Sequence, residues 1–372
     1  MNRSVKIFAV AALATATSLS AQNVPQIQFN AVDALSGFPE TIHLGEVAGV
    51  ARNSRNEIYV YTRTGDPTMS LGTSRYMSHF GSRIFKFDAR GRFEREIGQQ
   101  IYGAQFAQQV RIDRNDHVWV VDRMSGQVIR FDQQGRIVMV LSRKPEAMGG
   151  AVAAPPRGGG GGGAQAGRGG DAGRGGGGGG GGAAAGGRGG APAMPEGESF
   201  NSPVDVVWDA QGNIFVADGL ARTRIAKYDP EGRFVTNYAA PGAANIYGMQ
   251  IDAQGNLYVA DYGNQRILVV NSTNGQLIRE IRGVGSPMAI CVSPPPNQFL
   301  YVSNSNPPDN LEVGGEIYKV RLDGTIVGRF GTVGKRIGQF GTVNAIDCRV
   351  ENDLLVGEIG NWRVQRVTLR SE

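Results

Sequence analysis

The chain has 372 residues, of which 41% are hydrophobic and 19% charged, and a formal net charge of +5. This charge does not indicate a nucleic-acid surface, because Arg3 and Lys6 contribute +2 and the glycine-rich tract at 157–188 contributes the remaining +3. Two cysteines cannot form the disulfide framework of a small secreted protein.

The first 21 residues have the features of a secretory signal peptide. Arg3 and Lys6 form a basic start, residues 7–13 are apolar, and a zone rich in small residues ends at Ala21. The apolar stretch is too short to span a bilayer, which needs about 20 residues. We therefore expect an exported protein, periplasmic or secreted, that is cleaved near Ala21 and does not span the membrane.

A five-residue phrase is repeated in the second half of the chain. Asp-Ala-Gln-Gly-Asn occurs at 209–213 and again 43 residues later at 252–256, and each copy precedes an apolar run that ends in Ala-Asp. Self-similarity at 40 to 50 residues is typical of a propeller blade or a solenoid unit.

The clearest unit surrounds the second copy of this phrase. Its four expected strands span 247–251, 257–260, 266–270 and 277–281. Asn274-Gly275 separates the last two, and Asn-Gly between apolar runs is the strongest short hairpin signal. Four short strands at this period describe one propeller blade.

Five other units align with this one. Blade one contains 58–60 and the hairpin 88–93, blade two 108–122 and 132–137, blade three 204–218 and 229–234, blade five 299–302 and 323–324, and blade six 354–356 and 363–367. Blade six lacks a fourth strand, while residues 26–29 have no blade of their own. An N-terminal strand lent to the last blade removes an exposed edge. The sequence predicts an all-β, six-bladed propeller over 22–372, with 26–29 completing blade six.

The spacing also reveals two insertions. The equivalent residues Asp122 and Asp218 lie 96 residues apart instead of 43, which leaves 53 extra residues. Residues 144–199, rich in Gly, Ala and Arg, supply them and cannot bury enough apolar area to fold, so we expect a disordered insertion between blades two and three. A smaller insertion is expected at 66–79, within blade one.

Cys291 and Cys348 are expected on the first strands of neighbouring blades, one residue out of phase. A disulfide and two separate buried thiols both fit this placement, and the offset favours the thiols. Either state is compatible with an oxidising compartment.

These motifs resemble the NHL-repeat family of β-propellers. Pro203-Val204-Asp205-Val206 corresponds to the family's blade start, 255–261 to its Gly-Asn-Leu-Tyr-Val-Ala-Asp centre, and 264–267 to its Asn-x-Arg-Ile third strand. The resemblance covers nearly all of the mature chain except the glycine-rich insertion. It implies the fold and leaves the activity open.

The stretch 216–234 is similar to the peptidyl-hydroxyglycine amidating lyases, which are also six-bladed propellers. This resemblance implies three zinc-binding histidines on first strands. The matching positions here hold Gln108, Tyr247 and Asn344. A lyase-type zinc site is therefore not expected.

Other lyase positions are also changed. The family's carboxylate position holds Ala345 and its tyrosine position Leu220, while Arg63 matches an active-site arginine. The chain's own histidines, His43, His79 and His117, are expected at unrelated repeat positions. Because a catalytic zinc needs about three converging ligands, these histidines do not suggest one.

Two further sets of residues have structural interpretations. Acids end the second strands at Asp122, Asp218, Asp261 and Glu358. We expect them to accept hydrogen bonds from backbone N–H groups of the following turns rather than to form a functional ring. Trp119, Trp208 and Trp362 are expected in strands, where they pack the blades.

The beginnings of the first strands are expected to line the central channel, one end of which commonly binds ligands. The expected ring is Ala48, Gln108, Val204, Tyr247, Met288 and Asn344, with Asp205 at the next position. The candidate ligand-binding residues at this channel mouth are Arg63, Gln108, Asp205, Tyr247 and Asn344. Arg63 suits a carboxylate and Tyr247 offers a flat apolar face, which favours a peptide or small acid. Asp205 among amides could hold a calcium ion, and a water-filled channel without ligand is the alternative.

The sequence thus predicts a monomeric binding or interaction module for a small molecule, peptide or protein, but not for nucleic acid. No catalytic residue and no other cofactor is identified. The alternative is a lyase- or lactonase-like propeller enzyme with oxygen ligands or no metal.

Overall fold

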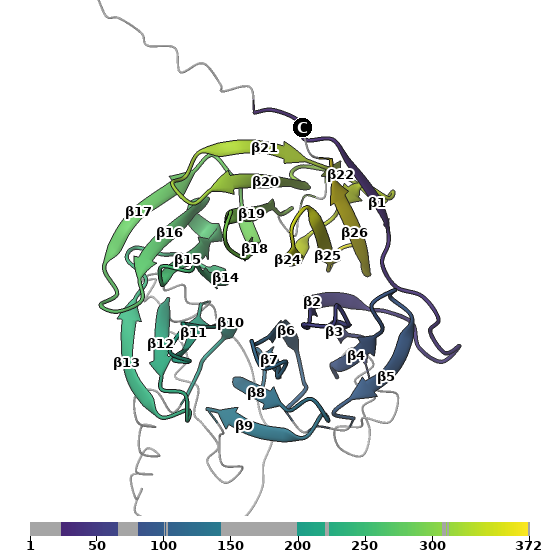
Figure 1. The fold of residues 1–372 in the computed structure, drawn as a ribbon, viewed down its shortest axis with the longest axis horizontal. Helices are drawn as coiled ribbons and strands as arrows, with labels where there is room; N and C mark the ends of the chain where they lie inside the picture. The colour runs from purple at the N-terminus through teal and green to yellow at the C-terminus, as the bar shows by residue number, and fades with distance from the viewer. Residues whose placement is uncertain are drawn as a thin grey trace, which may run out of the picture.

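The structure is a computed structural model that describes residues 24–65, 81–99, 101, 103–142, 199–219, 223–306, 310 and 312–370. Six four-stranded antiparallel sheets surround a central axis (Figure 1), so the predicted six-bladed β-propeller is confirmed. The expected signal peptide and the two expected insertions lie outside the described residues, except for Ser199. No helix in the described ranges is long and apolar enough to cross a membrane.

Each blade is one sheet, and in blades one to five the strands follow chain order from the axis outward. Blade one comprises β2 (Glu46–Arg52), β3 (Ile58–Arg63), β4 (Arg83–Phe87) and β5 (Phe93–Ile97); blade two comprises β6 (Ala107–Ile112), β7 (Val118–Asp122), β8 (Gln127–Phe131) and β9 (Ile137–Leu141). Blade three comprises β10 (Pro203–Trp208), β11 (Ile214–Asp218), β12 (Arg224–Tyr228) and β13 (Phe234–Ala239); blade four comprises β14 (Ile246–Ile251), β15 (Asn256–Asp261), β16 (Arg266–Asn271) and β17 (Leu277–Arg282).

The last two blades follow the same plan. Blade five comprises β18 (Pro287–Val292), β19 (Phe299–Asn304), β20 (Glu316–Arg321) and β21 (Ile326–Phe330); blade six comprises β24 (Val343–Val350), β25 (Asp353–Glu358), β26 (Arg363–Leu369) and β1 (Phe29–Asp33). A short 3-10 helix at Tyr262–Asn264 follows β15, and the two-residue strands β22 (Thr332–Val333) and β23 (Gln339–Phe340) pair between blades five and six.

The hydrophobic core is divided among the blade interfaces. Six buried clusters each combine residues of two neighbouring blades. Between blades one and two, for example, Tyr61 packs in one cluster with Val120 and Phe131. The second strands β7 and β11 are buried along their whole length, because a blade covers each of their faces. The ring is therefore held by side-by-side packing of blades, which leaves the axis free for polar groups.

The repeated phrase Asp-Ala-Gln-Gly-Asn forms the turn between a first and a second strand. The Oδ1 atom of Asp252 accepts hydrogen bonds from the backbone N–H groups of Gln254 at 2.9 Å and Asn256 at 2.8 Å, and Asn256 Nδ2 donates to Asp252 Oδ2 at 2.8 Å. Gly255 has a φ of 81°, which an L side chain rarely adopts. The phrase is repeated because its Asp and Asn side chains and its Gly satisfy this turn.

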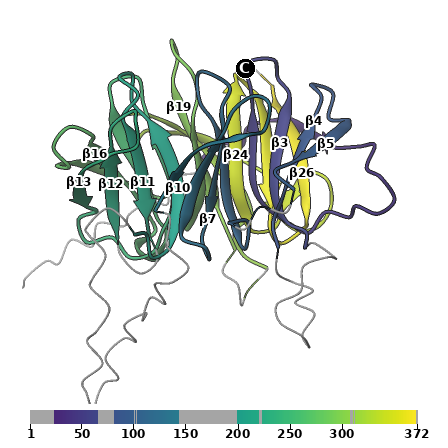
Figure 2. The ribbon, with the colours of Figure 1, turned by 90° about the horizontal axis from the view of Figure 1, so that it is seen from below.

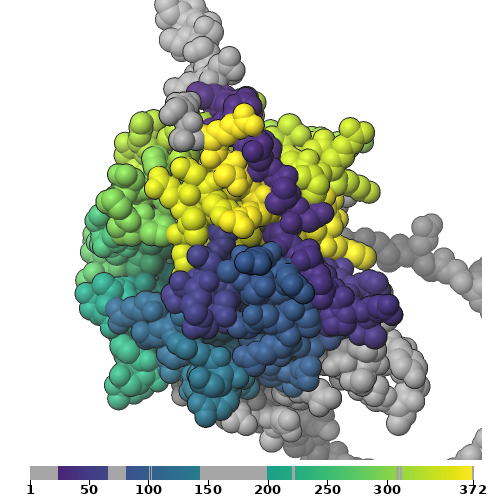
Figure 3. Space-filling model, turned by 45° about the vertical axis from the view of Figure 1, so that its right-hand side comes forward, coloured from purple at the N-terminus to yellow at the C-terminus, as the bar shows by residue number. Residues whose placement is uncertain are grey.

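The N-terminal segment closes the ring, as predicted, but at a different register. Strand β1 pairs with β26, with Ala31 opposite Val367, so the closing strand is 29–33 rather than 26–29. Ile27 instead donates its N–H to the carbonyl of Arg329 in blade five at 2.8 Å, and a side chain at Gly328 would collide with Ile27. Figure 3 shows this segment along the outer edge of blade six. The N-terminal chain thus joins the last two blades.

The strands run roughly along the axis of the propeller (Figure 2). The first strands all begin at one face, which we call the start face, and all end at the opposite one, the end face. The undescribed ranges 66–80, 143–198 and 220–222 join strand ends of the start face. Short turns connect the strands at the end face.

Cys291 in β18 and Cys348 in β24 form a disulfide, with 6.0 Å between their Cα atoms. The expectation of two separate thiols is therefore wrong. It assumed strict alternation, but β24 has a second irregularity between Asp347 and Val350, around Cys348. Bulges redirect side chains, so counting residues from the strand start gave the wrong phase. The disulfide links the inner strands of blades five and six.

The tryptophans divide into two groups. Trp119 and Trp208 lie in β7 and β10 with their rings 5.1 Å apart, and so pack blade two against blade three. Trp362 does not pack a blade: it lies in the turn before β26 with a φ of 54° and is 60% exposed. The apolar run that follows made it resemble a strand residue.

Candidate functional site

Each first strand contains a β-bulge near its beginning. The pairing with the second strand skips one residue in five blades and two residues in blade five. The skipped residues are Ala48, Gln108, Val204, Tyr247, Met288 with Ala289, and Asn344. These include all six ring positions that the sequence predicts. Bulges alter the direction of side chains and are frequent next to functional sites.

Three of the predicted channel-mouth residues are brought together. Asn344 Nδ2 donates to the carbonyl oxygens of Ala48 at 2.6 Å and Gln108 at 3.1 Å. Arg63 Nε donates to the carbonyl oxygen of Ala107 at 2.9 Å, the residue next to Gln108. Arg63, Gln108 and Asn344 therefore meet at the beginning of β6, where blades six, one and two converge.

Arg63 has its own partners at this position. Its Nη1 lies 2.8 Å from a carboxylate oxygen of Glu46, and its guanidinium carbon lies 3.8 Å above the ring of Phe106. Burial lowers the pKa of Arg63, although the guanidinium remains charged. The Arg63 side chain thus links blade one to blade two. Only the N–H donors that these contacts leave unused are available to a ligand.

Asp205 and Tyr247 are placed apart from that group. The Asp205 carboxylate is fully buried and accepts from Arg111 Nε at 2.9 Å, Arg111 Nη2 at 2.6 Å and the N–H groups of Val206 and Met249, both at 2.9 Å. The ring of Tyr247 contacts that of Tyr262 at 5.2 Å. No contact among the described residues joins either of them to Arg63. The calcium hypothesis stays a prediction, and a cation would have to compete with Arg111 for Asp205.

The acids that end the second strands have structural roles, but with different donors from those expected. Asp122 accepts from the backbone N–H groups of Gln105 at 2.8 Å and Phe106 at 2.6 Å and from the Tyr61 hydroxyl at 2.9 Å. Asp218, Asp261 and Glu358 likewise accept from Ser202, Ala244 and Gly341. These donors lie in the loop before the first strand, but at Asp122 the following turn also contributes, as expected, through the N–H of Ser125 at 2.8 Å. Burial raises the pKa values of both Asp122 and Tyr61.

A cavity of about 670 Å³ opens at the end face, on the axis; we call it the basin. All six first strands contribute to its wall through Arg52, Arg111, Val207, Gln250, Cys291 and Asp347. Its volume falls within the range of about 300–1,000 Å³ that is typical of small-molecule sites. It lies at the opposite end of the channel from the predicted mouth. Charged residues near the ends of several first strands, at Arg52, Arg111 and Asp347, are the feature of the sequence that could have indicated the basin.

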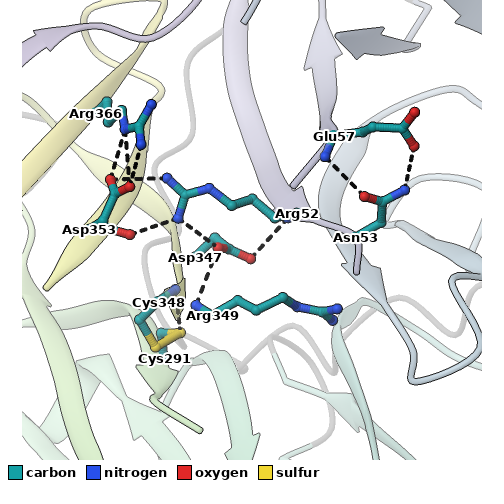
Figure 4. A network of polar contacts seen from close by, with 9 residues as sticks. All are labelled: Arg52, Asn53, Glu57, Cys291, Asp347, Cys348, Arg349, Asp353 and Arg366. Atoms are coloured by element: carbon teal, nitrogen blue, oxygen red, sulfur yellow. Dashed lines mark hydrogen bonds and ion pairs between the residues drawn. A yellow bond between two sulfur atoms is a disulfide. The ribbon is translucent and has the colours of Figure 1, made fainter. Parts of the chain in front are cut away.

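One side of the basin is a closed network of charges (Figure 4). Arg52 is buried, and its Nη1 donates to Asp347 Oδ1 at 3.4 Å and to the carbonyl oxygen of Asp353 at 2.7 Å. Its Nη2 lies 3.2 Å from Asp353 Oδ1, and Arg366 binds the same carboxylate. These groups join blade one to blade six and satisfy one another.

The guanidinium groups of two other arginines of the basin have no carboxylate partner among the described residues, although the backbone N–H of Arg349 donates to Asp347 Oδ1 at 3.3 Å. Arg349 extends away from the Arg52 network (Figure 4), and its Nη2 donates to the carbonyl oxygen of Ile112 at 2.9 Å. Arg114, at the exposed rim, donates to the carbonyl oxygen of Ala210 at 2.9 Å. A guanidinium has five N–H donors, so both can bind an added anion. Of the acids in the wall, Asp209 and Asp252 are held by the N–H groups of their own turns.

Two further observations delimit the chemistry of the site. A hollow of about 800 Å³ near Pro296, Lys319 and Leu369 lies away from the axis, at the rim of blades five and six. Among the described residues, no group of three His, Cys, Asp or Glu side chains could hold a metal ion. His117 pairs through Nδ1 with Asp113 at 2.9 Å. It is the guanidinium donors of Arg114 and Arg349 that favour recognition of an anion in the basin.

No protein-family model matches the chain. Two curated relatives from Xenopus laevis, the peptidyl-glycine alpha-amidating monooxygenases B and A, are 33% and 30% identical to it over 120 residues. The match covers 29% of this chain and only 14% and 13% of these relatives, so the chain spans about one seventh of their length.

Solved structures match over most of the chain. A gluconolactonase of Xanthomonas campestris, XC5397, has a TM-score of 0.56 and 13% identity, with 94% of this chain and 95% of that chain covered. A streptogramin B lyase has a TM-score of 0.53 and 12% identity, with 92% and 98% covered. Virginiamycin B lyase from Staphylococcus aureus has a TM-score of 0.52 and 10% identity, with 93% and 100% covered. Identities this low show the fold alone. The chain is a six-bladed β-propeller with distant, partial similarity to the amidating monooxygenases.

Proposed function

We propose that this protein is an exported ligand-binding propeller of the NHL type, and that its basin binds the carboxylate of a peptide or small organic acid. The observation that carries this proposal is the presence of Arg349 and Arg114 in one axial cavity without a carboxylate partner among the described residues. The planar donor array of a guanidinium matches the two oxygens of a carboxylate. Arg349 is partly buried, so its charge is less screened than that of an exposed arginine.

A peptide terminus is the form of carboxylate that we favour. The curated relatives are named for peptidyl-glycine, a peptide that ends in a small residue with a free carboxylate. The wall of the basin also carries the amide side chains of Gln250 and Gln254, which can donate to and accept from a peptide backbone. Both observations support recognition of a peptide terminus, and neither requires that the protein catalyse a reaction.

An enzymatic role is the second candidate function, because a gluconolactonase and lyases are among the matched structures. A hydrolase or lyase would need a general acid or base that reaches the ligand. The acids in the wall, Asp209, Asp252 and Asp347, accept hydrogen bonds from backbone groups or from Arg52. We therefore favour binding over catalysis.

The experiment compares two small probes on the mature chain. N-acetylglycine carries the carboxylate, and N-acetylglycinamide is its neutral counterpart. We expect calorimetric or NMR titration to show at least about 10-fold tighter binding of the acid, because a hydrogen bond to a charged group contributes about 1.5–3 kcal/mol. Arg349→Gln should remove this preference. Arg233→Gln, whose side chain is 76% exposed on a blade-three hairpin, is the matched control and should retain it. Equal binding of acid and amide, or no binding of either, would overturn the proposal.

A further inference from the structure

A smaller cavity of about 240 Å³ adjoins the basin between blades two and three; we call it the side pocket. Trp119, Arg130, Ile214 and Pro230 line it, and Arg114 and Trp208 line both it and the basin. The two cavities therefore share a wall. A ligand held by Arg114 in the basin would therefore lie beside the side pocket.

Two residues that line the side pocket each carry a buried donor without an acceptor. Trp208 Nε1 and Arg130 Nε have no hydrogen-bond partner among the described residues, whereas Trp119 Nε1 donates to Asp113 Oδ2 at 2.9 Å. They are two of the five buried side-chain nitrogen and oxygen atoms in the described ranges that lack a partner. Leaving such a group unpaired costs about 1–3 kcal/mol, so an acceptor at this place is favoured.

The aromatic residues that line the side pocket determine which ligand shape fits it. The indole rings of Trp119 and Trp208 lie 5.1 Å apart, and the Arg130 guanidinium lies 5.3 Å from the Trp119 ring. Flat apolar surfaces favour a planar group. A cavity of about 150 Å³ is large enough for benzene, so the side pocket has room for one six-membered ring with a small substituent. Trp208 and Arg130 are partly exposed as residues, so a side-chain rotation can bring either donor to the guest.

We infer that the side pocket is a second subsite for the basin ligand, and that it takes a flat ring together with a carbonyl oxygen that accepts from Trp208 or Arg130. The ligand class is then an acylated amino acid or peptide terminus with an aromatic group next to the carboxylate-bearing residue. The carboxylate half of this inference rests on the proposed function, because Arg114 belongs to both cavities. The ring rests on the indole surfaces and the volume of the side pocket, and the carbonyl oxygen rests on the two unpaired donors.

The test uses N-benzoylglycine, N-acetylglycine and the neutral N-methylbenzamide as probes on the mature chain. We expect N-benzoylglycine to bind about 10-fold more tightly than N-acetylglycine. Trp208→Phe keeps an aromatic ring but removes the N–H, and should reduce this preference about 3- to 10-fold, as expected for one hydrogen bond. Trp362→Phe, at the exposed turn, is the control and should leave it unchanged. Arg130→Met provides a second variant, should Trp208→Phe fold poorly.

The outcomes separate the two proposals. If N-acetylglycine binds through Arg349 but the benzoyl group adds nothing, the side-pocket inference is overturned and the proposed function stands. If only N-methylbenzamide binds, and does so in a Trp208-dependent manner, the side pocket is supported and the carboxylate site is not. If Trp208→Phe and Arg130→Met change the melting temperature but no binding constant, the donors serve buried water only, which overturns the inference.

Discussion

Arg349 of blade six donates to the carbonyl oxygen of Ile112 in blade two at 2.9 Å, although blade one lies between them. Arg111, the residue before Ile112, is bound instead to both carboxylate oxygens of Asp205. Two arginine side chains of one basin thus differ in their partners. The guanidinium of Arg111 is paired with a buried acid, whereas that of Arg349 donates to a backbone carbonyl.

This difference predicts unequal effects on stability. Arg111→Gln should lower the free energy of unfolding by about 3–5 kcal/mol, because it leaves the Asp205 charge buried without its partner. Arg349→Gln should lower it by no more than about 1 kcal/mol. Urea denaturation of both variants measures the difference. The double variant Arg111→Met/Asp205→Asn removes the buried charge and keeps an acceptor oxygen for a backbone N–H group, so it should recover part of the loss. A larger effect at Arg349 than at Arg111 would contradict this assignment.

The disulfide should contribute strongly to stability. Cys291 and Cys348 are 57 residues apart, and closing a loop of that size stabilises by about 4 kcal/mol in the chain-entropy account. We expect the Cys291→Ala/Cys348→Ala variant to melt roughly 5–15 °C below the wild type. Scanning calorimetry with and without reductant measures this. Reductant should affect the wild type and not the variant; an equal response of both would show that the bond is not the cause.

Ring closure through β1 predicts a defect on truncation. A chain that begins at Pro39 lacks the strand that covers β26 and leaves the apolar Val367 and Leu369 at an open edge. We expect a lower melting temperature and aggregation, because an unpaired edge strand templates pairing with other chains. Light scattering during a thermal melt records both. A chain that begins at Val24 is the control, and similar behaviour of the two chains would show that β1 is dispensable.

Glu57 makes the protein acid-sensitive. Burial alone would raise its pKa, but hydrogen bonds from Arg55, Lys86 and Asn53 outweigh that effect and lower it to about 2. Because the folded-state pKa lies below the ordinary value of 4.5, the stabilisation is complete above pH 4.5 and is lost as the pH falls toward 2. The Glu57→Gln variant should therefore have a lower free energy of unfolding than the wild type at pH 7. This free energy, measured by urea denaturation, should also change less between pH 4.5 and 2. Glu40→Gln, at an exposed position, is the control and should keep the wild-type dependence of the free energy of unfolding on pH. The same dependence in Glu57→Gln would show that Glu57 does not cause the acid sensitivity.

The channel mouth yields the last prediction. Arg63→Ala should destabilise the fold, since Arg63 contacts Glu46, Ala107 and Phe106, whereas Tyr247→Ala should not. If the basin is the ligand site, Tyr247→Ala leaves the dissociation constant of N-acetylglycine unchanged. Loss of binding in Tyr247→Ala, with the melting temperature preserved, would instead favour the mouth.

The sequence was most informative where one local structure recurs. The Asp-Ala-Gln-Gly-Asn turn is encoded within five residues, so its period revealed the blades, and the same alignment located the ring residues. The basin was missed because Arg52, Arg111 and Arg349 come from different blades at non-equivalent positions, and only the closed ring brings them together. The disulfide and the closing strand were misplaced for a related reason: an irregularity near Cys348 and the attachment of Ile27 to blade five shift the residue count locally.

The six bulges have a consequence for how this protein could diversify. A residue without a cross-strand partner can be exchanged with little effect on sheet pairing. The ring positions accordingly hold side chains as different as those of Ala48, Tyr247 and Asn344, while the strands around them keep the same register. Ala48 and Val204 pack in the cores between blades, whereas Tyr247 is partly exposed. A library that varies position 247 would therefore sample new side chains at the ring on an unchanged strand register.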